Sequence, residues 1–127
     1  MMARAVVRVH GATAFVAVAD LGGHAVGVVN IAGQNVALVS VASALGEAAS
    51  TLEPTQRFVE VADAGEHWLL WVDEAHDVIR AHEDQFDALG TPADAPIRSL
   101  LRLSLETVPV LNVAALAPKQ VFARAEG

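Results

Sequence analysis

The side chains most capable of chemistry lie in the middle of the chain, where three histidines occur among five acidic residues. Metal ligation would need three or four such groups to converge at about 2.0–2.2 Å, each oriented by a further hydrogen-bond partner. Their spacing is loose, so we interpret them as a solvated acidic face and expect neither a metal nor another cofactor. The alternative is a small β-barrel that binds a metabolite or a metal through this segment. The residues are His67, His76, His82, Asp73, Glu74, Asp77, Glu83 and Asp84.

The sequence contains no recognisable catalytic motif. The run His82–Phe86 begins like the zinc-helix motif HExxH, but Phe86 stands where the second histidine is needed. There is no cysteine, which excludes disulfides, thiolate metal sites and cysteine nucleophiles. Glycine-rich phosphate loops and the GxSxG nucleophile elbow are also missing. We therefore predict that the protein is not an enzyme.

The net charge of −7 is concentrated in one part of the chain. Residues 53–94 contain 11 of the 15 acidic residues and only two arginines, so this segment carries −9. Residues 1–52 are electrically balanced. Proteins that bind nucleic acid present a basic patch or stripe to the phosphates, and none is visible here. We therefore do not expect the protein to bind nucleic acid.

Two segments superficially indicate export or membrane insertion. The apolar stretch within residues 1–20 is at the minimum length for a signal peptide, and Arg8 and His10 prevent a longer one. Residues 21–46 carry no charge and are long enough to cross a bilayer. A lipid-facing helix, however, would bury the amides of Asn30 and its neighbours at a cost of several kcal/mol. We reject both readings and expect a cytoplasmic protein without membrane insertion.

Apolar runs around a turn predict a β-hairpin early in the chain. Residues 26–31 and 36–41 are β-branched runs that flank Ala32–Asn35, where glycine and asparagine can supply the positive φ angles of a turn. Neither run alternates cleanly between apolar and polar residues. We therefore expect both faces of this hairpin to be covered.

The rest of the chain continues the pattern of short strands. Trp68 and Trp71 stand three apart on one predicted strand, so they should point to opposite faces, one protected and one near a boundary. Residues 73–86 fit either a helix or a strand, and the polar segment 47–56 is expected to link two halves. At least seven short strands and no long helix predict a barrel or a sandwich. The further strands are expected at 57–61, 67–72, 97–105 and 108–113, and short helices at 42–45 and 114–116.

The order of these pieces resembles that of the CheW-like domains, the coupling proteins of bacterial chemotaxis. Residues 27–41, GVVNIAGQNVALVSV, are similar to the family signature GVxNLRGxVVPVxDL. The resemblance extends over about residues 5–116, and the pieces follow one another in the family's order. The other matching pieces are residues 59–61, 69–74, 77–80, 83–86, 97–103 and 110–116.

This resemblance implies a mainly β fold made of two small five-stranded barrels packed together. The chain would be a single CheW-like domain over residues 1–127, with a first subdomain at 1–52 and a second at 57–127. Residues 5–9 look like the end of the helix that follows the family's two opening strands, so we expect the first barrel to lack those strands. Unpaired strand edges of this kind lead us to expect self-association.

The resemblance also implies a function and its partners. CheW-like domains are non-enzymatic adaptors that bridge the regulatory domain of a CheA-type histidine kinase and the cytoplasmic tip of a chemoreceptor. The chain departs from the family pattern at Ala32, which replaces an arginine, at Ala37, which replaces a proline, and at Ser40, which replaces an aspartate. The residues expected to contact partners are Asn30, Ala32, Gly33, Val36, Leu38 and Trp71.

Overall fold

A computed structural model of the chain describes residues 2–3, 6–18, 23–47, 51–76 and 79–118. Within these residues the protein is built from ten strands, and its longest helical element has only four residues. The prediction of a mainly β protein is confirmed. The strands are β1 (Met2–Ala3), β2 (Val6–Gly11), β3 (Val16–Ala17), β4 (Ala25–Ile31), β5 (Gln34–Ser40), β6 (Arg57–Asp63), β7 (Glu66–Val72), β8 (Phe86–Ala88), β9 (Ile97–Arg102) and β10 (Thr107–Leu111), and the helical elements are α1 (Val41–Ala44), η1 (Glu83–Gln85) and η2 (Val113–Leu116).

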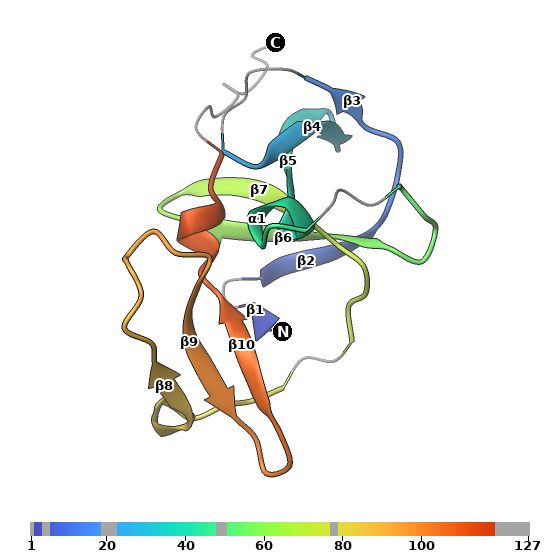
Figure 1. Cartoon of the computed structure of the whole chain (residues 1–127). Helices are drawn as coiled ribbons and strands as arrows, with labels where there is room; N and C mark the ends of the chain where they lie inside the picture. Colours follow the sequence, from blue (N-terminus) through green and yellow to red (C-terminus); the bar gives the residue numbers. More distant parts are fainter. Residues whose placement is uncertain (1, 4–5, 19–22, 48–50, 77–78, 119–127) are drawn as a thin grey trace.

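The strands form two sheets where two five-stranded barrels were expected. The larger sheet has six strands in the order β2-β6-β7-β5-β4-β3, and the smaller has four in the order β1-β10-β9-β8. Figure 1 shows the six-stranded sheet above the four-stranded one, with η2 between them. The chain crosses between the sheets twice, from β1 to β2 and from β7 to β8, and β1 pairs in parallel with β10 (Met2 opposite Val110).

Two hairpins of the six-stranded sheet share one kind of turn. The β4–β5 turn is Ala32-Gly33 and the β6–β7 turn is Ala64-Gly65, each a two-residue loop. All four residues have positive φ angles, from 50° to 85°. Two-residue hairpin turns with positive φ at both positions match the right-handed twist of the flanking strands. The expected hairpin is confirmed, but its positive φ angles fall on alanine and glycine rather than on asparagine.

Both faces of the central strands are buried, as predicted for the hairpin. Alternate residues on β5, β6 and β7 enter two different cores, because successive side chains of a strand point to opposite faces. The intra-sheet core lies within the six-stranded sheet and consists of the buried residues Val29, Leu38, Phe58, Leu69 and Trp71. The inter-sheet core joins the two sheets and consists of the buried residues Ala37, Val39, Val41, Val59, Val61, Trp68, Leu70, Leu111, Val113 and Leu116.

The two tryptophans follow this alternation. Trp68 enters the inter-sheet core and Trp71 the intra-sheet core, so the prediction of opposite faces is confirmed. The expectation that one would lie near an accessible boundary is wrong, since their exposed fractions are 1% and 9%. The rings of Phe15 and Phe58 pack edge-on against Trp71, with centroids 5.6 and 6.3 Å away, and cover it.

The opening of the chain differs from the prediction. The end of a helix was expected at residues 5–9, but residues 6–9 lie in strand β2, which pairs antiparallel with β6. Strand β3 follows and pairs with β4, so strands precede the hairpin, and α1 is the first helix in the described residues. The β-branched run Val6-Val7-Arg8-Val9 favours a strand because such side chains fit a pleated surface well.

The boundary between the sheets lies later in the chain than the polar segment 47–56. Strands β6 and β7 join β2 through β5 in the six-stranded sheet, and the four-stranded sheet receives β8, β9 and β10. Of the ambiguous segment 73–86, residues 73–76 and 79–82 form no helix or strand, residues 83–85 form η1, and Phe86 begins β8. In the described parts of the chain, no helix is long and apolar enough to cross a membrane.

Candidate functional site

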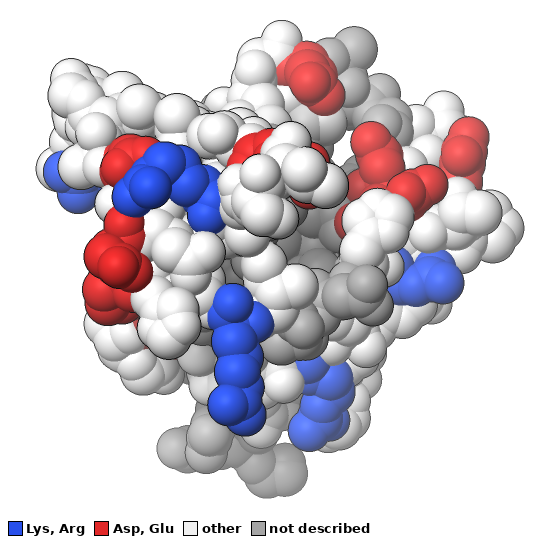
Figure 2. All heavy atoms as spheres, turned by 90° about the horizontal axis from the view of Figure 1, so that it is seen from below, with Lys and Arg blue, Asp and Glu red and all other residues white. Residues whose placement is uncertain are grey.

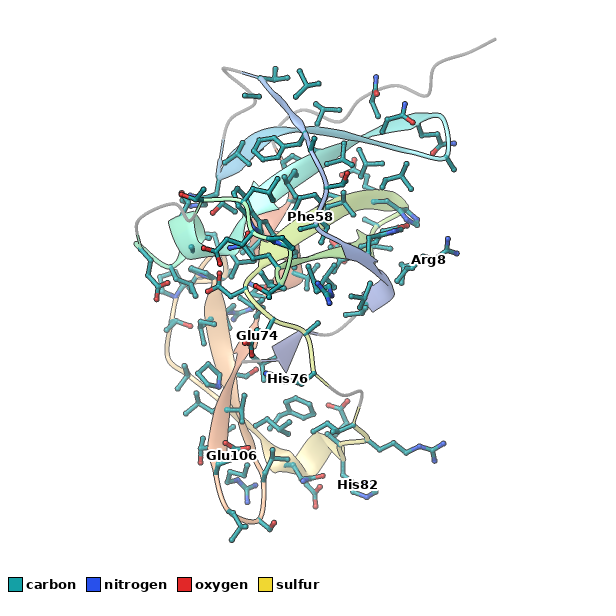
Figure 3. The ribbon with its side chains drawn as sticks, turned by 90° about the vertical axis from the view of Figure 1, so that its right-hand side faces the viewer. Arg8, Phe58, Glu74, His76, His82 and Glu106 are labelled. Carbon is teal, nitrogen blue, oxygen red and sulfur yellow. The ribbon has the colours of Figure 1, made fainter. Side chains whose placement is uncertain are left out.

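The two hairpin turns of the six-stranded sheet lie at the same end of it. Strands β5 and β7 are parallel neighbours, with Leu38 opposite Leu69, so both strands begin at that end. Figure 3 shows the β4–β5 and β6–β7 hairpins directed to the same side of the molecule. We call residues 30–35 and 63–66 the turn end. It combines two exposed loops on a rigid sheet, which is a common way to present a binding surface.

The β4–β5 half of the turn end is uncharged and held by its own hydrogen bond. The side-chain oxygen Oδ1 of Asn30 accepts a hydrogen bond from the main-chain N–H of Gly33, with 3.1 Å between the atoms. Exposed main chain and amide side chains make up the surface from residue 32 to residue 35. The β6–β7 half is acidic, since Asp63 and Glu66 are both exposed. A neutral hydrogen-bonding loop therefore lies beside an acidic one.

The six residues expected to contact partners separate into two groups. Asn30 lies exposed near the end of β4, and Ala32 and Gly33 lie exposed in the β4–β5 turn. Val36 is half-buried, Leu38 is 0% exposed and Trp71 is 9% exposed, and all three pack in or against the intra-sheet core. The side chain of Leu38 is fully buried because it packs among the other side chains of the intra-sheet core.

A buried polar contact near Trp71 involves a residue that the sequence did not single out. The indole N–H of Trp71 donates to Oε1 of Gln56 at 3.0 Å, and the same oxygen accepts from the main-chain N–H of Glu53 at 2.8 Å. The side-chain amide of Gln56 donates to Asp73 at 3.3 Å. Gln56 is 3% exposed although it ends the polar segment 47–56. No pattern in the sequence distinguishes it from its solvated neighbours.

A second polar cluster crosses three strands at Glu60. Nε2 of His10 on β2 lies 2.9 Å from Oε1 of Glu60 on β6, and Nδ1 of His67 on β7 lies 3.1 Å from Oε2. The hydrogen bond from His10 is the main cause that lowers the pKa of the Glu60 carboxyl from its ordinary 4.5; burial opposes the shift and His67 assists it. The alternation of side chains along β6 predicts that Glu60 shares a face with Phe58. It does not predict that Glu60 contacts two histidines.

The histidine-rich middle of the chain is not brought together. His67 joins Glu60, His76 lies 3.2 Å from its neighbour Glu74 in an exposed pair, and His82 precedes η1. Figure 3 places His82 well apart from Glu74 and His76. In residues 2–3, 6–18, 23–47, 51–76 and 79–118, no group of three histidine or acidic side chains could hold a metal ion. Asp77 lies outside the described residues.

One small hollow borders the polar contact at Trp71 and Asp73, and a wider one lies in another part of the molecule. A cavity of about 10 Å³ lies between Ser40, Ala42, Trp71 and Asp73, which is room for no more than one water molecule. A wide groove of about 520 Å³ lies between residues 79–85 and the β9–β10 turn. On the face shown in Figure 2, basic and acidic side chains are interspersed and form no continuous basic stripe.

Comparisons with known proteins agree with this architecture. The family model described as the CheW-like domain matches residues 2–121. Among solved structures, the crystal structure of the scaffolding protein TtCheW from Thermoanaerobacter tengcongensis is similar, with a TM-score of 0.73 and 15% sequence identity. That match covers 84% of this chain and 75% of the other, and it shows a shared fold. No curated protein sequence matches the chain.

Proposed function

Because the chain belongs to the CheW-like domain family, we propose that it is a non-enzymatic adaptor that couples a chemoreceptor to a CheA-type histidine kinase. The observation that carries this proposal is the family match over residues 2–121, combined with a two-sheet fold shared with a scaffolding protein. The partners are the regulatory domain of the kinase and the cytoplasmic tip of the receptor. The protein therefore acts in the cytoplasm, where both partners are found.

The turn end is the surface proposed to meet one of these partners. Asn30, Ala32 and Gly33 supply exposed main-chain and amide groups, and the hydrogen bond from Gly33 to Asn30 holds the loop in one conformation. Fixed loops lose little conformational entropy on binding. Val36, Leu38 and Trp71 support this surface from below, since the intra-sheet core anchors the strands that carry it.

Capture of purified partners tests the adaptor role directly. The kinase regulatory domain and a receptor-tip fragment are each immobilised, and binding of the folded protein is measured. Binding of both supports the proposal, whereas failure to bind either one contradicts it. A coupling assay extends the test: with receptor and kinase present, adding the protein should change the rate of kinase autophosphorylation.

A matched pair of variants tests the turn end. The change Ala32→Arg places a planar, multi-donor cation at the position where the family signature has arginine. The control Ala64→Arg makes the same change in the neighbouring turn, where the backbone has nearly the same φ angle of 50° against 51°. We expect Ala32→Arg to tighten capture of at least one partner several-fold and Ala64→Arg to leave it within twofold. Equal effects of the two variants would argue against a specific role for the β4–β5 turn.

Calorimetric titration discriminates the adaptor from a metal-binding barrel. The histidine and acidic side chains of the middle segment lie apart in the described structure. We therefore expect no stoichiometric heat of binding with Zn²⁺. A saturable one-to-one site would contradict this expectation and require a second function.

A further inference from the structure

Strand β2 forms an edge of the six-stranded sheet. It is the terminal strand in the sheet order and pairs with β6 on one side. Among the described residues no strand pairs with its other side. Edge strands present unpaired main-chain N–H and C=O groups that can pair with another extended chain. The question is what kind of chain this edge accepts.

The side chains of β2 are unusually apolar for an edge. The exposed fractions of Val6, Val7 and Val9 are 43%, 47% and 48%. Their neighbours on β6 are covered, since Val61 opposite Val6 is 0% exposed and Val59 opposite Val9 is 7% exposed. The apolar side chains of the sheet are therefore buried as far as β6 and exposed on β2. A strand added beside β2 would bury apolar surface as well as pair its main chain.

Arg8 is the one charged residue of β2. It lies directly opposite Glu60 in the β2–β6 register. The two oxygens of that carboxylate instead contact His10 and His67, one each. In the described part of the chain, Arg8 is exposed and makes no hydrogen bond or ion pair. Figure 3 shows its side chain extending away from the ribbon into solvent.

We propose that β2 is a docking edge for an extended, apolar segment of a partner protein that carries an acidic side chain opposite Arg8. An unpaired guanidinium beside open main-chain groups attracts a carboxylate and repels a basic strand, so charge complementarity selects the occupant. The register shift between Val6 and Arg8 adds to this selectivity, because bulges suppress indiscriminate edge pairing. This inference does not rest on the proposed adaptor function.

A second copy of the chain fits this edge less well. Pairing two β2 strands about a twofold axis would bring the Arg8 side chains of both copies close together, and like charges near one another oppose pairing. Each copy also carries a net charge of −7. A helix is a poorer occupant as well, since its main-chain groups are already paired and cannot extend a sheet.

Nuclear magnetic resonance titration with a designed peptide tests the proposal. The probe is an eight-residue peptide of alternating threonine and valine with one central glutamate. The control peptide has glutamine in place of that glutamate. With the full-length protein, we expect amide signals of residues 6–11 to shift and the glutamine peptide to bind about two- to five-fold more weakly, as one exposed ion pair allows. The difference should shrink at high salt. Absence of binding, equal affinities or shifts located elsewhere would overturn the proposal.

Three variants separate the edge from the rest of the surface. Arg8→Gln should abolish the difference between the two peptides, and Val9→Lys should weaken binding of both, because a charge at an open edge opposes strand addition. Val16→Lys is the matched control, since Val16 is 69% exposed on β3, the strand at the opposite edge of the sheet. It should leave binding unchanged. If the free protein is a dimer that Val9→Lys converts to a monomer, a second copy occupies the edge and the proposal is wrong.

Discussion

The six-stranded sheet and the region from residue 79 to residue 118 are stabilised in different ways. Seven of the eight largest fully buried side chains in the described chain belong to the six-stranded sheet, and Leu101 on β9 is the exception. Both faces of the central strands β5, β6 and β7 contribute to a core. Apolar burial therefore stabilises this sheet, at roughly 25 cal/mol for each Å² removed from water.

The region from residue 79 onward depends more on hydrogen bonds to loops. The side-chain amide of Asn112 donates to the carbonyl oxygens of Ala93 and Ala95, both at 3.0 Å. Arg102 joins Asp87 at 2.7 Å and donates to the carbonyl oxygen of Asp84. These contacts connect the loop around residues 93–95 to the residue after β10, and β8 and η1 to the end of β9. Local opening costs less where buried apolar contacts are few, so this region should open before the six-stranded sheet does.

Truncation of Leu69 should have the largest effect on stability. Leu69→Ala removes a 0% exposed side chain from the intra-sheet core, and such changes cost about 2–5 kcal/mol of unfolding free energy. Chemical denaturation with fluorescence detection measures the loss. Leu101→Ala, equally buried in the four-stranded sheet but outside both cores, should cost less. A larger loss at Leu101 would reverse the comparison between the two regions.

Replacement of Asn112 should loosen one loop rather than the whole protein. Asn112→Ala removes two hydrogen bonds to the loop around residues 93–95, which predicts a loss of about 1–2 kcal/mol. Hydrogen exchange should then accelerate in the loop and at the start of β9, while β5 and β7 keep their protection. Uniform acceleration across both sheets would show that the loop contributes to global unfolding.

Glu60 should make the stability of the six-stranded sheet depend on acid pH. Because the pKa of Glu60 is lowered in the folded state, its carboxylate adds stability above its ordinary pKa of 4.5, and this contribution is lost as pH falls through the folded pKa. Glu60→Gln should cost about 1 kcal/mol at neutral pH, as for one hydrogen bond, and nothing at strongly acid pH. Denaturation curves from pH 2 to 7 measure the difference. A constant difference across that range contradicts the assignment.

The Arg102–Asp87 ion pair should contribute least. Its side chains are 55% and 49% exposed, and exposed pairs are worth about 0.2–1 kcal/mol. Asp87→Asn, which leaves the bond from Arg102 to the carbonyl oxygen of Asp84 in place, should therefore lower stability by no more than this amount, and added salt should reduce the effect. The control Arg98→Gln, on the same strand as Arg102 and exposed, should leave the denaturation midpoint unchanged.

Local sequence patterns predicted most of the strands but not all of the strands with which they pair. The β-branched runs at 26–31 and 36–41 became β4 and β5, and the glycine turn near Asp63 joined β6 to β7. The residues at 5–9 were misassigned to a helix because their place in a family order outweighed their β-branched composition. Strand formation at β2 depends on pairing with β6, about fifty residues away, which no local window contains.

The candidate site shows the same division. The sequence predicts that Ala32 and Gly33 lie in a turn, and the structure agrees. It could not show that Leu38 is fully buried, because both neighbouring residues are also apolar and alternation gives no preferred face. Gln56 and Glu60 were missed, since their partners Trp71 and His10 lie 15 and 50 residues away.

The sequence by itself determined the β character of this protein, its hairpin turns and its family, because these depend on residue types at short and fixed spacings. Tertiary structure alone decided which side chains of β5 and β7 enter which core, which carboxylate His10 and His67 share, and that Arg8 makes no hydrogen bond or ion pair within the described residues. Those outcomes depend on strand order and register, which arise from contacts between distant segments. The relative stability of alternative arrangements of the whole sheets determines them, and no short stretch of the chain contains the contacts on which that stability depends.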